Sequence, residues 1–196
     1  DEIDFDKLPN QFVLKCTHDS GGLVICKDKR TLDKAKAKKK IEKSLKRDYF
    51  LVGREYPYKE VKPRIIAEKY MEDTATQELR DYKIFTFDGI AKALSIVSNR
   101  QVGKTAADYF DINFKPLDFT WGYSHSKVLP FKSKSFDYMV RAAECLVRDT
   151  VELQVDFYEV NGKAYFGEMT FFDGKDFDTF DPEEWNQKFG DLIKLP

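Results

Sequence analysis

The stretch LQVDFYEVNGKAYFGEMTFF, residues 153–172, decides the fold of this chain. Alternating aliphatic and aromatic residues on either side of Asn161-Gly162 predict two antiparallel strands joined by a tight turn. The first of these strands carries Asp156, and the second carries Glu168. The two acids therefore belong to one hairpin, and the length of its turn decides whether they lie close together.

Two turn lengths are possible for this hairpin, and they predict different faces for the acids, because side chains alternate between the faces of a sheet. A two-residue loop, 161–162, would pair residue 156 with 167 and place Asp156 and Glu168 on opposite faces. A three-residue loop, 160–162, would place both acids on one face with Gln154 and Thr170. We expect the three-residue loop, because Gly162 suits the left-handed position of a turn with a bulge.

Two carboxylates on one sheet face match the oxygen ligands that Mg2+ prefers, usually together with phosphate oxygens. A pair of exposed strand acids without a ligand is the alternative interpretation, and these residues alone do not decide between the two. The metal site becomes the better interpretation if a phosphate-binding loop lies elsewhere in the chain.

The composition is that of a folded protein, because 42% of the 196 residues are hydrophobic and 15% are aromatic. The 33 basic and 34 acidic residues give a formal net charge of -1, so only local clusters could attract nucleic acid or a membrane. No apolar run is long enough to span a membrane, and the first ten residues lack a signal-peptide layout. Three cysteines without CxxC spacing indicate reduced thiols, and we expect a cytoplasmic protein.

A lysine-bearing strand followed by a glycine loop opens the chain. Residues 11–16, QFVLKC, predict a strand that carries Lys15, and residues 17–22, THDSGG, predict a loop before a second strand. The backbone amides of Ser20, Gly21 and Gly22 could approach phosphate oxygens closely, and Lys15 adds a positive charge. An ordinary hairpin turn beside a surface lysine is the alternative, which a Gly-Gly loop taken alone favours.

The rest of the chain is predicted to form helices and strand pairs. We expect a small lobe, residues 1–70, and a large lobe, residues 71–196. The lysine-rich helix and the long loop named below are the places where an acidic polymer could bind. The predicted elements are a lysine-rich helix at 31–47, a strand at 63–71, a hairpin at 81–97 that turns at Asp88-Gly89, a long loop at 101–131, a helix at 135–148 and a last helix capped by Asp181-Pro182.

Five blocks of sequence, taken together, resemble the TupA-like family of the ATP-grasp superfamily, which is linked to cell-surface polysaccharide and teichuronopeptide synthesis. The resemblance implies an α+β protein with the ATP-grasp fold, in which two lobes of antiparallel sheet with helices enclose a nucleotide cleft. Family chains usually carry more sequence before the LPNQFVLK block, so we expect a truncated N-terminal lobe. The blocks are FVLKCTHDSGG, YPYKEVKPRIIAEKYMED, DYKIFTFDG, VDFYEVNGKAYFGEMTF and FDPEEWNQKFGDL.

The resemblance also implies a role for each matching residue in binding ATP. The adenine edge would bind main-chain groups of Lys69 and Met71, with Glu68 at its amino group and Tyr70 packed nearby, and Asp81 would bind the ribose hydroxyls. The phosphates would lie under a flap formed by Ser20, Gly21 and Gly22. The positive charges on the phosphates would be Lys15, Lys83 and Arg100, and the Mg2+ ligands would be Asp156, Glu168 and Thr170.

The activity that the resemblance implies is that of an ATP- and Mg2+-dependent carboxylate–amine ligase. A carboxylate of an acidic sugar or polysaccharide precursor would form an acyl phosphate with ATP, and an amine donor would then displace phosphate. Two departures from the superfamily pattern are Gln154, which stands where an arginine is frequent, and Thr170, which stands where an asparagine is common. They leave a catalytically weak nucleotide- or saccharide-binding module as an alternative. A polysaccharide glycosyltransferase is a third interpretation, for which a doubly wound parallel pattern is missing.

Overall fold

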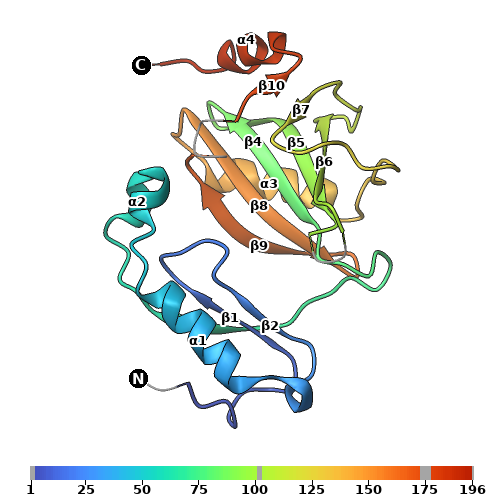
Figure 1. The fold of residues 1–196 in the computed structure, drawn as a ribbon. Coiled ribbons are helices and arrows are strands. Elements are labelled where there is room, and N and C mark those ends of the chain that lie inside the picture. Colours follow the sequence, from blue (N-terminus) through green and yellow to red (C-terminus); the bar gives the residue numbers. More distant parts are fainter. Residues whose placement is uncertain (1–2, 101–102, 173–177, 196) are drawn as a thin grey trace. The chain divides into compact units, whose positions relative to one another are not determined.

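The computed structural model describes residues 3–100, 103–172 and 178–195, and the chain divides into two compact units, Asp1–Met71 and Glu72–Pro196 (Figure 1). Each unit is built around its own antiparallel sheet with helices packed on it, so the architecture is α+β as predicted. None of the described helices is long and apolar enough to cross a membrane.

Unit 1 is a three-stranded sheet covered on one face by a helix. The strands β1 (Phe12–Cys16), β2 (Val24–Cys26) and β3 (Ile65–Lys69) lie in the order β2-β1-β3, and α1 (Lys34–Leu45) packs on the sheet. Alternate residues of β1 are buried, and they form a core with Ile41 of α1. The Asp33 side chain accepts a hydrogen bond from the Lys36 amide, so α1 begins three residues later than the sequence predicted. The remaining short helices of this unit are η1 (Lys29–Thr31), α2 (Phe50–Gly53) and η2 (Tyr56–Tyr58).

Unit 2 contains a five-stranded antiparallel sheet with a core on each face. The strand order is β6-β5-β4-β8-β9, and α3 (Phe136–Leu146) covers one face. The other face is covered in part by an aromatic cluster from β7 (Thr120–Trp121), β10 (Phe180–Asp181) and α4 (Glu184–Gly190). The strands of the sheet are β4 (Asp81–Phe87), β5 (Ile90–Ser98), β6 (Ala106–Asp111), β8 (Glu152–Val160) and β9 (Lys163–Thr170).

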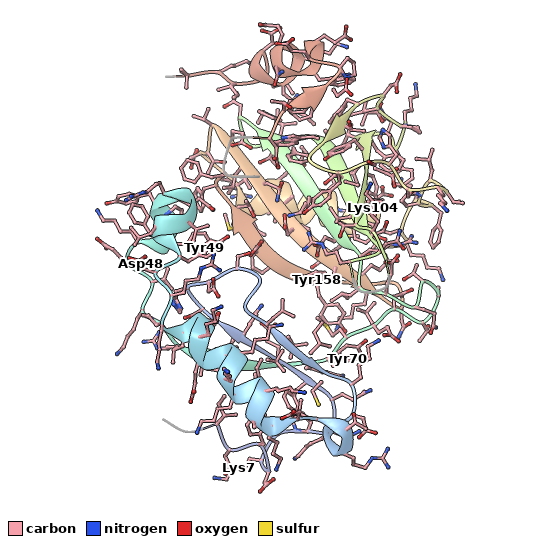
Figure 2. All side chains as sticks on the ribbon, viewed as in Figure 1. Lys7, Asp48, Tyr49, Tyr70, Lys104 and Tyr158 are labelled. Atoms are coloured by element: carbon pink, nitrogen blue, oxygen red, sulfur yellow. The ribbon has the colours of Figure 1, made fainter. Side chains whose placement is uncertain are left out.

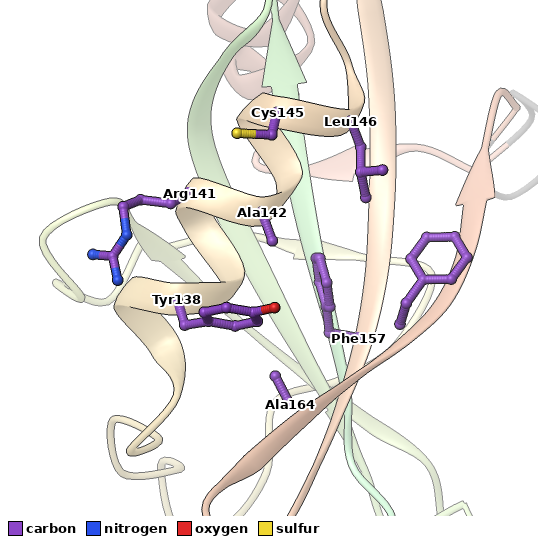
Figure 3. Close-up of a pocket in the computed structure, with 8 residues that line it drawn as sticks. Tyr138, Arg141, Ala142, Cys145, Leu146, Phe157 and Ala164 are labelled. Carbon is purple, nitrogen blue, oxygen red and sulfur yellow. The ribbon is translucent and has the colours of Figure 1, made fainter.

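The helix α3 does not fully cover the sheet face on which it packs, and a hollow remains next to β8 and β9. This apolar hollow has a volume of about 620 Å³ and lies between α3 and the hairpin (Figure 3). Phe166 of β9 lines it and remains 54% exposed. The hollow is therefore lined in part by an exposed apolar side chain.

The β8–β9 hairpin reaches the predicted arrangement of its acids by a different route. Its loop has two residues, not the predicted three, because Val160 pairs with Lys163, and Asn161 and Gly162 both have positive φ angles, 53° and 78°. That register alone would place Asp156 and Glu168 on opposite faces. A β-bulge shifts the register between the Phe157–Phe166 and Asp156–Glu168 pairs, so that Gly167 has no partner and the acids lie directly opposite each other.

Two further expectations from the sequence are corrected in unit 2. The loop predicted at 101–131 contains β6 and β7, although residues 101–102 lie outside the described part of the chain. The residues Asp181-Pro182 do not cap the last helix, because Asp181 belongs to β10 and Glu183 is the first residue flanking α4. The hairpin predicted at 81–97 is confirmed as β4–β5, with its turn at Asp88-Gly89.

The bulge generates a prediction about Gly167. A Cβ atom at this position would lie 3.1 Å from the Asp156 carbonyl oxygen and 3.2 Å from Cε2 of Tyr158. The substitution Gly167→Ala should therefore lower the free energy of unfolding by about 1 kcal/mol or more, measured by urea denaturation. Gly190→Ala is the control, because a Cβ there meets nothing within 4 Å. Equal stability of the two variants would contradict the tight packing of the bulge.

Candidate functional site

The candidate site of unit 2 lies on the sheet face opposite α3 and is centred on Asp156. In the strand register Asp156 lies opposite Glu168 on one side and opposite Lys83 of β4 on the other. Residues that are directly opposite each other share a face, and so do residues two apart along a strand. The face therefore brings together the sequence-predicted residues Asp81, Lys83, Asp156, Glu168 and Thr170.

Both carboxylate oxygens of Asp156 have partners in the sheet. Oδ2 forms an ion pair with Lys83 Nζ, and Oδ1 accepts a 2.7 Å hydrogen bond from Nε2 of Gln154. Asp156 is only 3% exposed, and burial raises its pKa to about 7 even though Lys83 acts in the opposite direction. The acid is thus held in one orientation by two donors, while the Oε1 atom of Gln154 is buried without a hydrogen-bond partner among the described residues.

A second acid–base pair lies beside the first, at the start of β4. Asp81 Oδ2 lies 2.6 Å from Nη2 of Arg100, and the hydroxyl of Tyr158 acts to lower the pKa of the same carboxylate. Burial raises the pKa of Asp81, while Arg100 and Lys83 lower it. Burial also raises the pKa of Tyr158, which is labelled in Figure 2, so this side chain stays a neutral donor. Two acids and two cations therefore lie close together, with Lys83 on the sheet and Arg100 just after the end of β5.

The donor set of this face fits a magnesium ion. Asp156 and Glu168 supply carboxylate oxygens, and Thr170, opposite Gln154 in the register, supplies a neutral oxygen. Glu168 is exposed and Thr170 is half-buried, so both side chains are accessible. In the described part of the chain no group of three or more His, Cys, Asp or Glu side chains could hold a metal. Two carboxylates suffice when phosphate and water supply the remaining ligands, as is usual for Mg2+.

In unit 1 the predicted phosphate-binding lysine lies on the sheet face that α1 does not cover. Lys15 follows the buried Leu14 on β1, and its Nζ atom lies 2.8 Å from Oε1 of Glu68 on β3. Both side chains of this ion pair are almost half exposed, so the pair contributes little to stability. The structure thus joins two residues that the sequence assigned to different parts of the nucleotide.

The loop between β1 and β2 is fixed at its base and open at its tip. The Asp19 carboxylate is buried and accepts a hydrogen bond from the Ser44 hydroxyl of α1. A Cβ at Gly22 would lie 1.8 Å from Ser44 Oγ, so only glycine allows this approach. Ser20 and Gly21 are exposed, and Gly21 has a φ angle of 80°. The loop can therefore present backbone amides while its base stays attached to α1.

The predicted adenine segment, residues 68–71, begins at the end of β3, which pairs with β1 in the same sheet. Glu68 and Lys69 are the last residues of β3 and pair with Val13 and Phe12 of β1. Lys27 Nζ lies 5.3 Å from the centre of the Tyr70 ring, and Met71 is half-buried. These positions are compatible with exposed main-chain groups at the end of a strand, and the roles of these residues stay predictions.

The sequence interpretation missed two contributors to the unit 2 site. Tyr158 was not singled out, although it lies two residues from Asp156 on the same strand and so on the same face. Gln154 was predicted to share this face and was noted as a missing arginine, but its role was not predicted: its amide orients Asp156. Strand parity was the available signal for both residues, but it says nothing about which side chain meets which partner.

The buried carboxylate generates a prediction about the pH dependence of stability. The pKa of Asp156 is about 7 in the folded chain against 3.8 for the unperturbed group, so the folded protein loses stability as pH rises from 4 to 7. Asp156→Asn removes this loss. The stability of the variant relative to the native protein should rise by up to roughly 1.4 kcal/mol per pH unit in this window.

Urea denaturation of both proteins in metal-free buffer, at intervals from pH 4 to 8, measures that difference. The lost Lys83 ion pair adds an offset to every measurement, so the slope is the quantity that decides. A difference that does not change with pH would contradict the burial of a charged Asp156.

Nearly the whole chain is similar to one protein family and to solved ligase structures. A family model described as TupA-like ATPgrasp matches residues 1–194, whereas no curated protein gives a significant match. D-alanine–D-alanine ligase from Bacillus anthracis is similar in structure at 18% sequence identity and a TM-score of 0.49, covering 98% of this chain and 56% of the ligase. The same ligase complexed with ATP gives 16% identity and a TM-score of 0.44, covering 86% of this chain and 43% of the ligase.

This chain spans about half the length of those ligase structures. The family model, by contrast, extends over nearly all of the 196 residues. The chain therefore belongs to the TupA-like ATP-grasp family.

Proposed function

We propose that this protein is an ATP- and Mg2+-dependent carboxylate–amine ligase. The observation that carries the proposal is the register that places Asp156 between Glu168 and Lys83 on one face, beside the Asp81–Arg100 pair. Two acids for a cation and two cations for an anion are the combination that a Mg2+-bound triphosphate requires. Membership in an ATP-grasp family supports the same conclusion.

Each unit contributes its own residues to nucleotide binding in this proposal. In unit 1 Lys15 leaves its weak ion pair with Glu68 for phosphate oxygens, and the amides of Ser20, Gly21 and Gly22 cover them. Glu68 is then available for the adenine amino group. The main-chain groups of Lys69 and Met71, with the Tyr70 ring, complete the adenine site.

In unit 2 of this proposal, the carboxylates hold the Mg2+ ion and the positively charged side chains hold the phosphates. Asp156, Glu168 and Thr170 would bind Mg2+, which neutralises charge on the phosphates when bound. Lys83 already contacts Asp156, so a small movement of its flexible side chain would transfer its charge to a phosphate oxygen. Arg100 is half exposed, so its side chain can also move from a carboxylate, that of Asp81, to a phosphate oxygen. Asp81 is then available for the ribose hydroxyls.

The chemistry that suits these groups is acyl activation by phosphoryl transfer. A substrate carboxylate oxygen forms a bond to the γ-phosphorus of ATP, and the bond from that phosphorus to the bridging oxygen breaks, which yields an acyl phosphate and ADP. An amine then attacks the acyl carbon, loses a proton and releases phosphate. Lys15, Lys83 and Arg100 position the phosphates and offset the negative charge, so no enzyme nucleophile is needed.

The substrates follow from the family and stay at the level of chemical class. We propose an acidic sugar or polysaccharide precursor as the carboxylate, an amine donor as the second substrate, and a role in cell-surface polysaccharide biosynthesis at the cytoplasmic stage, where ATP is available. A second candidate is a nucleotide- or saccharide-binding module of low activity. The neutral Gln154 beside Asp156 favours it, because a charge that could stabilise phosphoryl transfer is missing there.

Calorimetric titration with ATP tests the nucleotide site. We expect the native protein to bind ATP only in the presence of Mg2+. The variants Asp156→Ala and Asp156→Asn should either fail to bind ATP or bind it with an affinity that no longer depends on Mg2+. Lys15→Met should weaken binding by roughly tenfold to a hundredfold, because a charged hydrogen bond contributes about 1.5–3 kcal/mol. Asp137→Ala is the matched control, an exposed acid on α3 of unit 2. Binding by the native protein without Mg2+ at undiminished affinity would contradict the metal site.

Release of ADP and phosphate separates the ligase from the binding module. Candidate sugar acids and amino acids are supplied together with ATP and Mg2+, and turnover is expected only when a carboxylate and an amine are both present. Hydroxylamine, a general amine that traps acyl phosphates, should replace the natural donor and give a hydroxamate. Tight Mg2+-dependent ATP binding without any turnover across carboxylate classes would favour the binding module instead.

A further inference from the structure

The segment that runs from β7 to the start of α3 carries basic residues without acidic ones. Residues 119–136, FTWGYSHSKVLPFKSKSF, contain three lysines and no acidic residue, in a chain whose formal net charge is -1. Lys127, Lys132 and Lys134 are exposed. Lys132 Nζ lies 2.9 Å from Asp137 Oδ1, whereas Lys127 and Lys134 have no acidic partner in the described part of the chain. The segment is thus a local cluster of positive charge.

The same segment exposes large apolar side chains at its tip, residues 128–131. Val128 is 82% exposed, Leu129 is 51% exposed and Phe131 is 59% exposed. Pro130 between them is buried, so it fixes the tip while its neighbours face outward. Such a group of neighbouring exposed apolar residues is unusual on a globular protein and commonly marks an interaction site.

The base of this loop is fixed to the sheet, so the exposure of the tip is imposed by the fold. The Ala107 amide of β6 donates a 3.1 Å hydrogen bond to the Ser124 carbonyl, and the segment runs beside β6 at the sheet edge (Figure 1). Asp108, fully buried, accepts a hydrogen bond from the Ser126 amide and lies 3.3 Å from Nδ1 of His125.

The loop is fixed at its other end as well. Ser135 donates two hydrogen bonds, from its amide and its hydroxyl, to the buried carboxylate of Glu159 on β8. Within the loop, the Ser126 hydroxyl donates to the Val128 carbonyl at 2.6 Å. Both ends of the loop are therefore bonded to the sheet, while the apolar side chains of its tip are exposed.

We propose that this loop is a membrane-binding site, in which Leu129, Phe131 and Val128 enter the interface of an anionic phospholipid bilayer while Lys127 and Lys134 contact the headgroups. The apolar tip suits the acyl region of the bilayer and the flanking lysines suit its anionic headgroups, and the two contributions to binding act together. A polyanion in solution would use the lysines and leave the apolar tip in water. The inference is independent of the ligase proposal.

Co-sedimentation with lipid vesicles tests this site. The whole chain is expected to bind vesicles that contain phosphatidylglycerol, to bind pure phosphatidylcholine weakly, and to bind less as salt is raised. The double variant Leu129→Ser, Phe131→Ser should lose at least about tenfold in affinity, because each side chain gives up apolar burial. Lys127→Glu with Lys134→Glu should lose at least about tenfold for phosphatidylglycerol vesicles.

Matched controls identify the loop as the cause. Phe166→Ser removes a side chain with 54% exposure from the hollow beside α3, and Lys39→Glu with Lys40→Glu reverses two exposed charges on α1. Both controls should bind vesicles like the native protein. Calorimetry with ATP on the same preparations separates this result from the outcome of the ligase proposal.

Three results would overturn the inference. The first is no binding to phosphatidylglycerol vesicles, and the second is binding that the α1 control abolishes while the loop variants keep it. The third is a concentration-dependent dimer of the native protein that Leu129→Ser, Phe131→Ser dissociates, since a second copy would then cover the tip.

Discussion

The candidate site of unit 2 depends on one irregularity, the β-bulge that leaves Gly167 without a partner. A two-residue turn at Asn161-Gly162 sets a register in which Asp156 and Glu168 would face opposite sides of the sheet. The extra residue changes the parity of β9, so both acids reach the face of Lys83. The close approach of Gly167 to the Asp156 carbonyl explains why the smallest residue stands at this position.

The second constraint is electrostatic, because two acids of this face, Asp156 and Asp81, are buried. Asp156 and Asp81 each have a cation as neighbour, Lys83 and Arg100 respectively. A buried carboxylate without a partner would destabilise the fold, so these cations serve stability as well as the proposed chemistry. Flexible cations that can exchange a carboxylate for a phosphate would connect the folded arrangement to nucleotide binding. The weak Lys15–Glu68 ion pair at the surface of unit 1 would allow Lys15 to make the same exchange of a carboxylate for a phosphate.

Local patterns made much of the fold predictable from sequence. The Asp88-Gly89 and Asn161-Gly162 turns, the strand with Lys15 and the apolar stripe of α3 are all set by neighbouring residues. The shared face of Asp156 and Glu168 was predicted correctly but from a three-residue turn, which is wrong, because the bulge and not the turn brings the acids together. The bulge was not predictable, because Gly167 resembles any glycine in a strand until its packing against Tyr158 is known.

Features set by tertiary contacts were missed for the same reason. The strand β6 lies in a segment whose Gly, Asp, Tyr and Ser content predicts a loop, and its pairing with β5 is a tertiary contact that this composition does not indicate. The pairing of Lys83 with Asp156 joins residues 73 positions apart. Which cation meets which acid depends on the order of strands in the sheet, and the sequence contains no local sign of that order.

Anomalous diffraction from crystals grown with Mn2+ and a non-hydrolysable ATP analogue tests the central claim most directly. The account predicts a manganese peak within about 2.5 Å of carboxylate oxygens of both Asp156 and Glu168, with phosphate oxygens completing its coordination. Bound nucleotide whose metal lies on other residues, or acids that bind no metal while the nucleotide is present, would contradict it.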